Sequence, residues 1–211
     1  MKSDQKSKIL NESTRIFLRD GFYKTPMDEI AKELKISKKT IYKYFDSKDT
    51  LVKDVVLNFL NLNKNNISQI LDRNDDAIKK AFNLFQYFGQ LLVKINNKWI
   101  QDIQNHYRYL WKGIDDFRTE MMLANISKLI EQGKKEGFIV DYPTNIIVMF
   151  FISSIRGIIN PDFIVEHKLD PATVLNPTIK LLMNAILTNK GKELFNKLQP
   201  ELINEENTAD F

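Results

Sequence analysis

The sequence contains no cysteine, which excludes a disulfide framework and any metal site built from thiolates. It has only 7 glycines and 6 prolines in 211 residues, few for a fold made of many strands and turns. Its most apolar run, residues 146–159, contains Arg156 and is too short to cross a bilayer. No apolar segment of a signal peptide stands in the polar N-terminus. We therefore expect a helix-rich protein of the cytoplasm that has no membrane partner.

Motifs of catalysis are absent as well. The sequence has no HExxH pair, no glycine-rich phosphate loop and no G-x-S-x-G turn. Its two histidines, His106 and His167, stand far apart and outside any nucleophile or metal pattern. We therefore expect neither an enzyme nor a bound metal or cofactor.

What the chain does have is an uneven distribution of charge. The whole sequence carries a formal net charge of +4, whereas residues 1–53 alone hold 13 basic and 8 acidic residues, a net of +5. Residues 54–211 are therefore close to neutral. This asymmetry indicates that the N-terminal quarter binds a polyanion.

Residues 25–51 have the pattern of a helix-turn-helix. Thr25 is suited to an N-cap and Pro26 to a first helical position, and apolar residues follow at helical spacing. Ser37 is the expected N-cap of a second, short helix, and Ser47 that of a third. Two short helices joined by a tight turn are typical of proteins whose second helix enters the DNA major groove.

The outward side of the second helix has the chemistry of a DNA contact surface. Lys38, Lys39, Tyr42 and Lys43 point away from the apolar side of this helix, and five lysines face one acid between residues 35 and 48. Lysine ammonium groups bind phosphates, and hydroxyl groups reach phosphates or base edges. A solvated basic surface is the alternative interpretation for any single lysine. The whole constellation favours DNA.

The same block resembles the DNA-binding domain of the TetR/AcrR family of bacterial regulators. The residues that carry the resemblance are Gly21, Phe22, Thr25, Ile30, Ala31, Ser37, Thr40, Ile41, Tyr42, Tyr44, Phe45, Ser47, Lys48 and Leu51. The chain departs from the family pattern at Lys35 and Lys39, two positions where members often have glycine. The first departure predicts backbone strain, and the second alters the surface that reads the bases.

The resemblance implies an all-helical homodimer with a C-terminal ligand-binding domain and a palindromic operator in double-stranded DNA. We therefore predict an all-α fold, with a DNA-binding domain at residues 1–47 and an effector-binding and dimerisation domain at 48–211. Together with the spacing, it predicts the DNA contacts Thr25, Ser37, Lys38, Lys39, Thr40, Tyr42, Lys43, Tyr44 and Lys48.

Helical periodicity continues along most of the chain. It predicts helices at about 7–20, 47–63, 75–95, 98–111, 113–136, 143–159 and 171–188, with a basic arm before residue 8, a bend at 63–75 and a connecting loop at 160–170.

The apolar run at 146–159 is interpreted either as a buried core helix or as a dimer interface formed with the helix at 171–188. Palindromic half-sites favour the interface, because they require a two-fold protein. The residues predicted for it are Ile147, Phe150, Ser153, Ser154, Gly157, Thr178, Leu181, Leu182 and Ala185.

Aromatic residues are dense between residues 82 and 117, and they are interpreted either as core or as the lining of an apolar cavity. The second interpretation predicts a small hydrophobic effector bound by Trp99, His106, Tyr107, Trp111, Phe117 and Met121. The leading hypothesis is a dimeric repressor that such an effector releases from DNA. The alternative is a ligand-independent DNA organiser or partner-binding regulator on the same fold.

Overall fold

The computed structural model describes residues 2–95, 97–158, 160–169 and 171–205. Over these ranges the chain is helical, and the one extended pairing found there is an isolated bridge between Ile139 and Leu187. The prediction of an all-α fold is confirmed. The helices are α1 (Lys2–Asp20), α2 (Met27–Glu33), α3 (Lys38–Tyr42), α4 (Lys48–Leu71), α5 (Ala77–Lys94), α6 (Asn97–His106), α7 (Arg108–Lys135), α8 (Thr144–Ile158), α9 (Pro161–Glu166), α10 (Pro171–Ile186) and α11 (Asn189–Glu205).

Two helices extend beyond their predicted ends. The predicted basic arm is wrong, because α1 already begins at Lys2. The predicted bend at 63–75 is wrong in its first half, because α4 continues to Leu71. The polar residues of this stretch suit an exposed helix face, while Ile67 and Ile70 are buried on the other face and stabilise the additional turns.

Two other boundaries also differ from the predictions. The break between α6 and α7 lies at Tyr107 rather than near Gly113, because the Tyr107 ring is buried and its hydroxyl donates to Asp49 Oδ1 at 3.1 Å. The predicted loop at 160–170 contains the short helix α9. Its backbone bond from Ile164 N to Asn160 O, 2.9 Å long, closes the first turn.

The described residues form two compact units. The first unit contains residues 2–65 and 93–117, and the second contains residues 66–92 and 118–205. This division differs from the predicted boundary after residue 47. The physical reason is that Trp99, Ile103 and Tyr107, which follow the helix-turn-helix by fifty residues, are buried in the core of the first unit.

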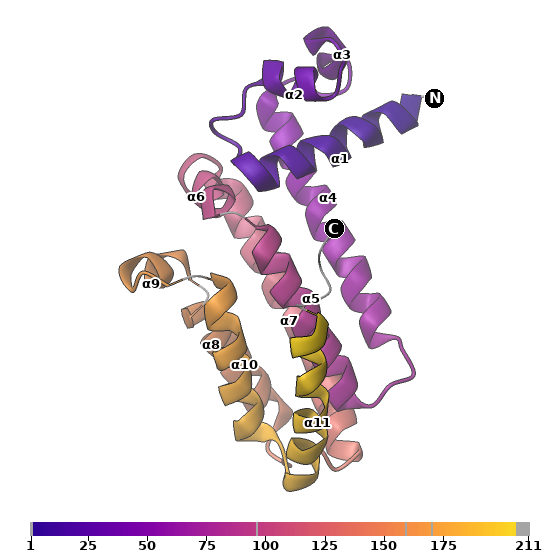
Figure 1. Ribbon diagram of the computed structural model, residues 1–211, viewed down its shortest axis with the longest axis vertical. Coiled ribbons are helices and arrows are strands. Elements are labelled where there is room, and N and C mark those ends of the chain that lie inside the picture. Colours follow the sequence, from indigo (N-terminus) through magenta and orange to yellow (C-terminus); the bar gives the residue numbers. More distant parts are fainter. Residues whose placement is uncertain (1, 96, 159, 170, 206–211) are drawn as a thin grey trace. The chain divides into compact units, whose positions relative to one another are not determined.

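In the first unit, α1 crosses the first half of α4, and α2 and α3 lie near the start of α4 (Figure 1). Phe17, Ile41 and Val52 meet in this core and are fully buried. Aromatic rings of distant segments also meet, since the Phe22 centroid lies 5.3 Å from that of Trp99. The segment that leads into the helix-turn-helix is therefore packed against α6.

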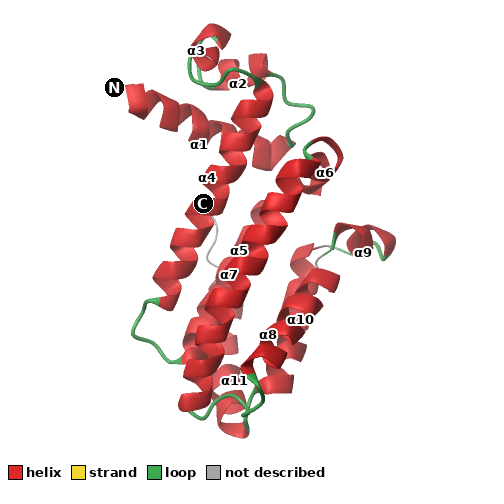
Figure 2. Ribbon diagram, turned by 180° about the vertical axis from the view of Figure 1, so that it is seen from behind, coloured by secondary structure: helices red, strands yellow, loops and turns green. Residues whose placement is uncertain are grey.

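The second unit has a separate core. Helices α8 and α10 lie side by side (Figure 2), and Ile147 and Phe151 of α8 pack with Leu182 of α10. Helices α5, α7 and α11 add further apolar residues to the same cluster. In the described part of the chain, no helix is both long and apolar enough to cross a membrane.

The turn between α1 and α2 requires glycine. Gly21 has φ +85°, a left-handed conformation, and a Cβ atom there would lie 2.5 Å from Asp102 Oδ2. The same carboxylate oxygen accepts hydrogen bonds from the backbone N–H groups of Phe22, at 2.7 Å, and Tyr23, at 2.9 Å. Helix α6 thus orients the segment that leads into the helix-turn-helix.

We expect Gly21→Ala to destabilise the first unit by about 2–4 kcal/mol, since it adds left-handed strain to a collision with Asp102. Urea unfolding followed by circular dichroism measures the change. Gly113→Ala is the matched control, because Gly113 lies inside α7 in the same unit with no atom within 4 Å of its added Cβ. That variant should be neutral or stabilised by up to about 1 kcal/mol. Equal stability of both variants would contradict the role of the turn.

Candidate nucleic-acid interface

The turn between α2 and α3 is a Schellman motif with a lysine in the position usually taken by glycine. Lys35 has φ +54°. The N–H of Ile36 donates to Ala31 O at 3.0 Å and that of Lys35 to Lys32 O at 3.1 Å, the bond pair that defines the motif. The predicted strain at Lys35 thus has a structural basis, because a side chain in this conformation costs about 1 kcal/mol.

Two of the three predicted N-caps are confirmed. Ser37 Oγ accepts a hydrogen bond from Thr40 N at 3.0 Å, and Ser47 Oγ accepts one from Thr50 N at 3.1 Å. The third is wrong, since Pro26 holds the N-cap position of α2 and Thr25 is 1% exposed. The Thr25 hydroxyl donates to Gly21 O at 2.8 Å. Because its side chain is buried, Thr25 is not available to contact DNA.

Helix α3 separates an apolar side from a basic side. Ile41 is fully buried, while Lys39, Lys43 and Tyr42 are exposed, Tyr42 to 41%. Thr40 is half-buried, and its hydroxyl shares a 2.8 Å hydrogen bond with the Ser37 hydroxyl. The exposed side of α3 thus presents two ammonium groups and a phenol, a combination that binds phosphates and base edges.

Lys38 is engaged by an acid of the preceding helix. Its Nζ lies 2.9 Å from Asp28 Oδ2, and both side chains are exposed. The hydrogen bond to Asp28 raises the pKa of the Lys38 ammonium. A phosphate that binds Lys38 must therefore compete with Asp28.

Tyr44 and Lys48 make contacts within the first unit. The Tyr44 hydroxyl donates to Gln5 Oε1 of α1 at 3.2 Å. Lys48 Nζ donates to Tyr23 O at 3.0 Å, and partial burial lowers the pKa of its ammonium group. Both residues connect the helix-turn-helix to its supporting segments.

Three carboxylates on the first unit are the only described group of acids and histidines dense enough to suggest a metal site. Asp20, Glu29 and Glu33 place carboxylate oxygens within 4.8 Å of one another. Arginines pair with two of the three, because Arg19 pairs with Asp20 and Glu33, and Arg15 pairs with Glu33. The hydrogen bond from Arg19 also lowers the pKa of Asp20. The group is an ion-pair network.

The six residues predicted to bind an effector do not come together in one unit. Residues 99, 106, 107, 111 and 117 belong to the first unit, and Met121 belongs to the second. Trp99 and Tyr107 are 4% and 7% exposed in the core that supports the helix-turn-helix. The imidazole of His106 stacks on the Tyr23 ring with centroids 3.9 Å apart. For Trp99 and Tyr107 the aromatic density serves packing, the interpretation that competed with a cavity.

Helices α8 and α10 each have a buried and an exposed side. The predicted interface residues Ile147, Thr178 and Leu182 are buried in the second unit, and Ser154 is half-buried. The other five are exposed: Phe150, Ser153, Gly157, Leu181 and Ala185. Ile146 and Met149, which the prediction omitted, are exposed on the same side of α8. The spacing 146, 149, 150, 153, 157 is the helical signal that identifies them.

Comparison with known proteins agrees with this geometry. Residues 9–55 match the family described as bacterial regulatory proteins, tetR family. The chain is 26% identical to the uncharacterized HTH-type transcriptional regulator YvaF of Bacillus subtilis over 184 residues, which cover 87% of this chain and 96% of YvaF.

It is also 25% identical over 96 residues to IcaR of Staphylococcus epidermidis, named a negative transcriptional regulator of the biofilm operon icaADBC. That match covers 46% of this chain and 50% of IcaR. The crystal structure of a transcriptional regulator from Cytophaga hutchinsonii has the same fold, with a TM-score of 0.70, 18% identity, and coverage of 86% of this chain and 98% of that one. The resemblance found in the sequence is confirmed.

We expect Asp28→Asn to increase DNA affinity about 2- to 5-fold, because Lys38 then binds phosphate without a competing carboxylate. The slope of log K against log salt should steepen by up to about one unit. Fluorescence anisotropy with a labelled duplex at several salt concentrations measures both. Glu29→Gln is the control, since it removes one charge from the same helix without freeing Lys38. Equal gains in the two variants would mean that only net charge matters.

Proposed function

Since the chain belongs to the TetR family of bacterial transcriptional regulators, we propose that it is a homodimeric repressor that a small effector releases from a palindromic operator. It acts on DNA in the cytoplasm and catalyses no reaction. The exposed Lys39, Tyr42 and Lys43 on a capped helix are the observation that carries the proposal.

Within the DNA contact surface, the residues differ in role. Lys39, Tyr42 and Lys43 have no competing partner among the described residues and bind DNA directly. Ser37 and Thr40 lie at the N-terminus of α3, where their hydroxyls reach a phosphate. Lys38 exchanges Asp28 for phosphate, whereas Tyr44 and Lys48 contribute mainly by holding α3 and α4 against their neighbours.

An exposed apolar patch on the second unit supports the homodimer. Ile146, Met149 and Phe150 of α8 are 46–61% exposed, and Leu181 of α10 is 71% exposed. Four large apolar side chains on two packed helices are costly to leave in water. The small Ser153, Gly157 and Ala185 allow a second copy to approach closely. A two-fold partner that covers this patch matches the symmetry of a palindrome.

Repression is proposed from the printed role of IcaR, which regulates its operon negatively. Release by an effector is proposed because α4 is continuous, from Lys48 beside the helix-turn-helix to Leu71 in the second unit. A ligand that favours one packing of this helix changes operator affinity, typically by about 1–3 kcal/mol. The effector is not proposed to bind the six aromatic-region residues, because Trp99, Tyr107 and Trp111 pack in the DNA-binding core.

Selection of genomic fragments by the purified protein, followed by sequencing, tests the proposal. Recovery of one or a few palindromes in promoters is the expected result. Many dispersed sites without symmetry would favour the ligand-independent organiser, and no enrichment at moderate salt would overturn DNA binding itself.

We expect Tyr42→Ala to weaken binding of the selected palindrome by about 10- to 100-fold, because a base or phosphate contact is lost from the centre of the surface. Anisotropy titration measures the loss. Tyr142→Ala is the control, since Tyr142 is 62% exposed in the second unit. Wild-type affinity in the Tyr42 variant would show that α3 does not read the operator.

We expect Met149→Glu combined with Leu181→Glu to convert the dimer into a monomer of 24.8 kDa, because a two-fold interface places these charges close to their copies. Light scattering after gel filtration measures the mass. Leu123→Glu is the control, as Leu123 is 43% exposed on α7 rather than on α8 or α10. A double variant that remains dimeric would place the interface elsewhere.

A further inference from the structure

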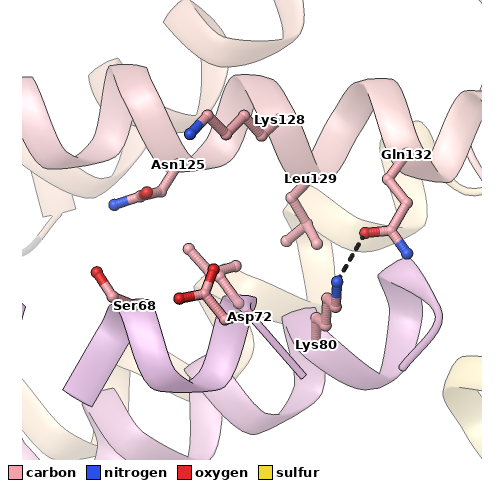
Figure 3. Close-up of a pocket in the computed structure, with 8 residues that line it drawn as sticks. Ser68, Asp72, Lys80, Asn125, Lys128, Leu129 and Gln132 are labelled. Carbon is pink, nitrogen blue, oxygen red and sulfur yellow. Dashed lines mark hydrogen bonds between the residues drawn. The ribbon is translucent and has the colours of Figure 1, made fainter. Parts of the chain in front are cut away.

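The second unit contains a polar cleft that no part of the proposed function uses so far. Its volume is about 290 Å³, and it lies between the end of α4, the start of α5 and the C-terminal half of α7. Figure 3 shows Ser68 and Asp72 on one side of it and Asn125 and Lys128 on the other. All of the lining residues belong to the second unit.

Several polar groups in this cleft lack a protein partner. Among the described residues, no hydrogen bond or ion pair involves the Ser68 hydroxyl, the Asp72 carboxylate or the Lys128 ammonium. Ser68 is half-buried, whereas Asp72 and Lys128 are exposed, so the polar groups of all three can be reached from solvent. Their hydrogen-bonding capacity is therefore available to a ligand.

Lys80 adds a second positive charge to the cleft, and its ammonium group can donate further hydrogen bonds. Its Nζ donates one hydrogen bond, to Gln132 Oε1 at 3.1 Å (Figure 3), out of the three that an ammonium group can donate. Gln132 is itself held in place, since its Nε2 donates to Asp75 O at 3.0 Å and Glu136 Oε1 at 2.7 Å. Lys80 is half-buried and positioned at one end of the cleft.

The charged groups that line the cleft make it unsuitable for a ligand that is purely apolar, purely anionic or purely cationic. An apolar ligand would leave Ser68, Asp72 and Lys128 desolvated without partners. A simple anion would face the Asp72 carboxylate, and a simple cation would face two lysines. A molecule with both charges satisfies all of these groups, while Leu71 and Leu129 pack against its carbon atoms.

We propose that this cleft binds a small zwitterion, a carboxylate with an ammonium group and the size of an amino acid. Lys128 binds the carboxylate, Asp72 binds the ammonium group, and the Ser68 hydroxyl and Asn125 amide supply further hydrogen bonds, while Lys80 stands at the opposite end of the cleft from Lys128 (Figure 3). The volume is at the lower end for ligand pockets, which suits this size. The proposal deepens the proposed function and rests on it in one respect: the zwitterion is the effector.

Isothermal titration calorimetry of the full chain with each of the twenty common L-amino acids tests the site. Propionate and propylamine, which carry one charge each, are the comparison probes. Saturable binding of at least one amino acid, at least tenfold tighter than either single-charge probe, is the expected result. The site is overturned if no amino acid binds, or if propionate or propylamine binds equally well.

Two variants then locate the binding. Asp72→Asn and Lys128→Gln should each weaken the bound amino acid at least tenfold. The matched controls are Glu120→Gln and Lys135→Gln, which remove the same charges from exposed positions of α7 outside the cleft and should leave affinity unchanged. Full affinity in both cleft variants would place the ligand elsewhere and overturn the proposal.

Operator binding, measured in the same samples, separates the proposed function from the proposal that the cleft binds a zwitterion. Release of the operator by the bound amino acid supports both. If the ligand-free protein selects no genomic fragment, the proposed function fails, whereas calorimetry still decides the cleft. If it selects an operator and no amino acid binds, the cleft proposal alone fails.

Discussion

The first unit depends on one carboxylate. Asp102 accepts the N–H groups of Phe22 and Tyr23 and lies against Gly21, so a single side chain of α6 fixes the turn between α1 and α2. Charge-assisted hydrogen bonds to backbone N–H groups are stronger than neutral ones. The angle at which the chain enters α2, and with it the position of α3, follows from this contact.

The helix-turn-helix itself could be predicted from the sequence because its signals are local. Ser37 and Ser47 cap helices that begin one residue later. The strain at Lys35, whose φ is +54°, was predicted from its place in the family pattern. The role of Asp102 could not be predicted. It lies eighty residues from Phe22, and an aspartate in a polar helix carries no signal of a distant partner.

For the candidate sites too, local signals could be predicted from the sequence, whereas contacts between distant segments could not. The apolar run of α8 predicted an interface on the second unit, and several of its residues are exposed. Ile147 was assigned to the exposed side but is buried, because in so apolar a helix the two sides have similar residues. The aromatic residues around Trp99 were ambiguous between core and cavity, and packing decided for core. The polar cleft could not be predicted, because Ser68 and Asp72 stand in a stretch whose composition resembles a bend.

The first unit consists of two separate stretches of the chain, and this constrains the order in which the two units can be completed during synthesis. A ribosome that has synthesised residues 1–65 has completed the helix-turn-helix, but Trp99, Ile103 and Asp102 are still to come. Until residues 97–106 emerge, the apolar side of α1 and α4 has no partner from α6, and residues 66–92 are synthesised before them. The part of the chain that is translated first is therefore completed only after the middle of the chain, and competence to bind DNA arises late in synthesis.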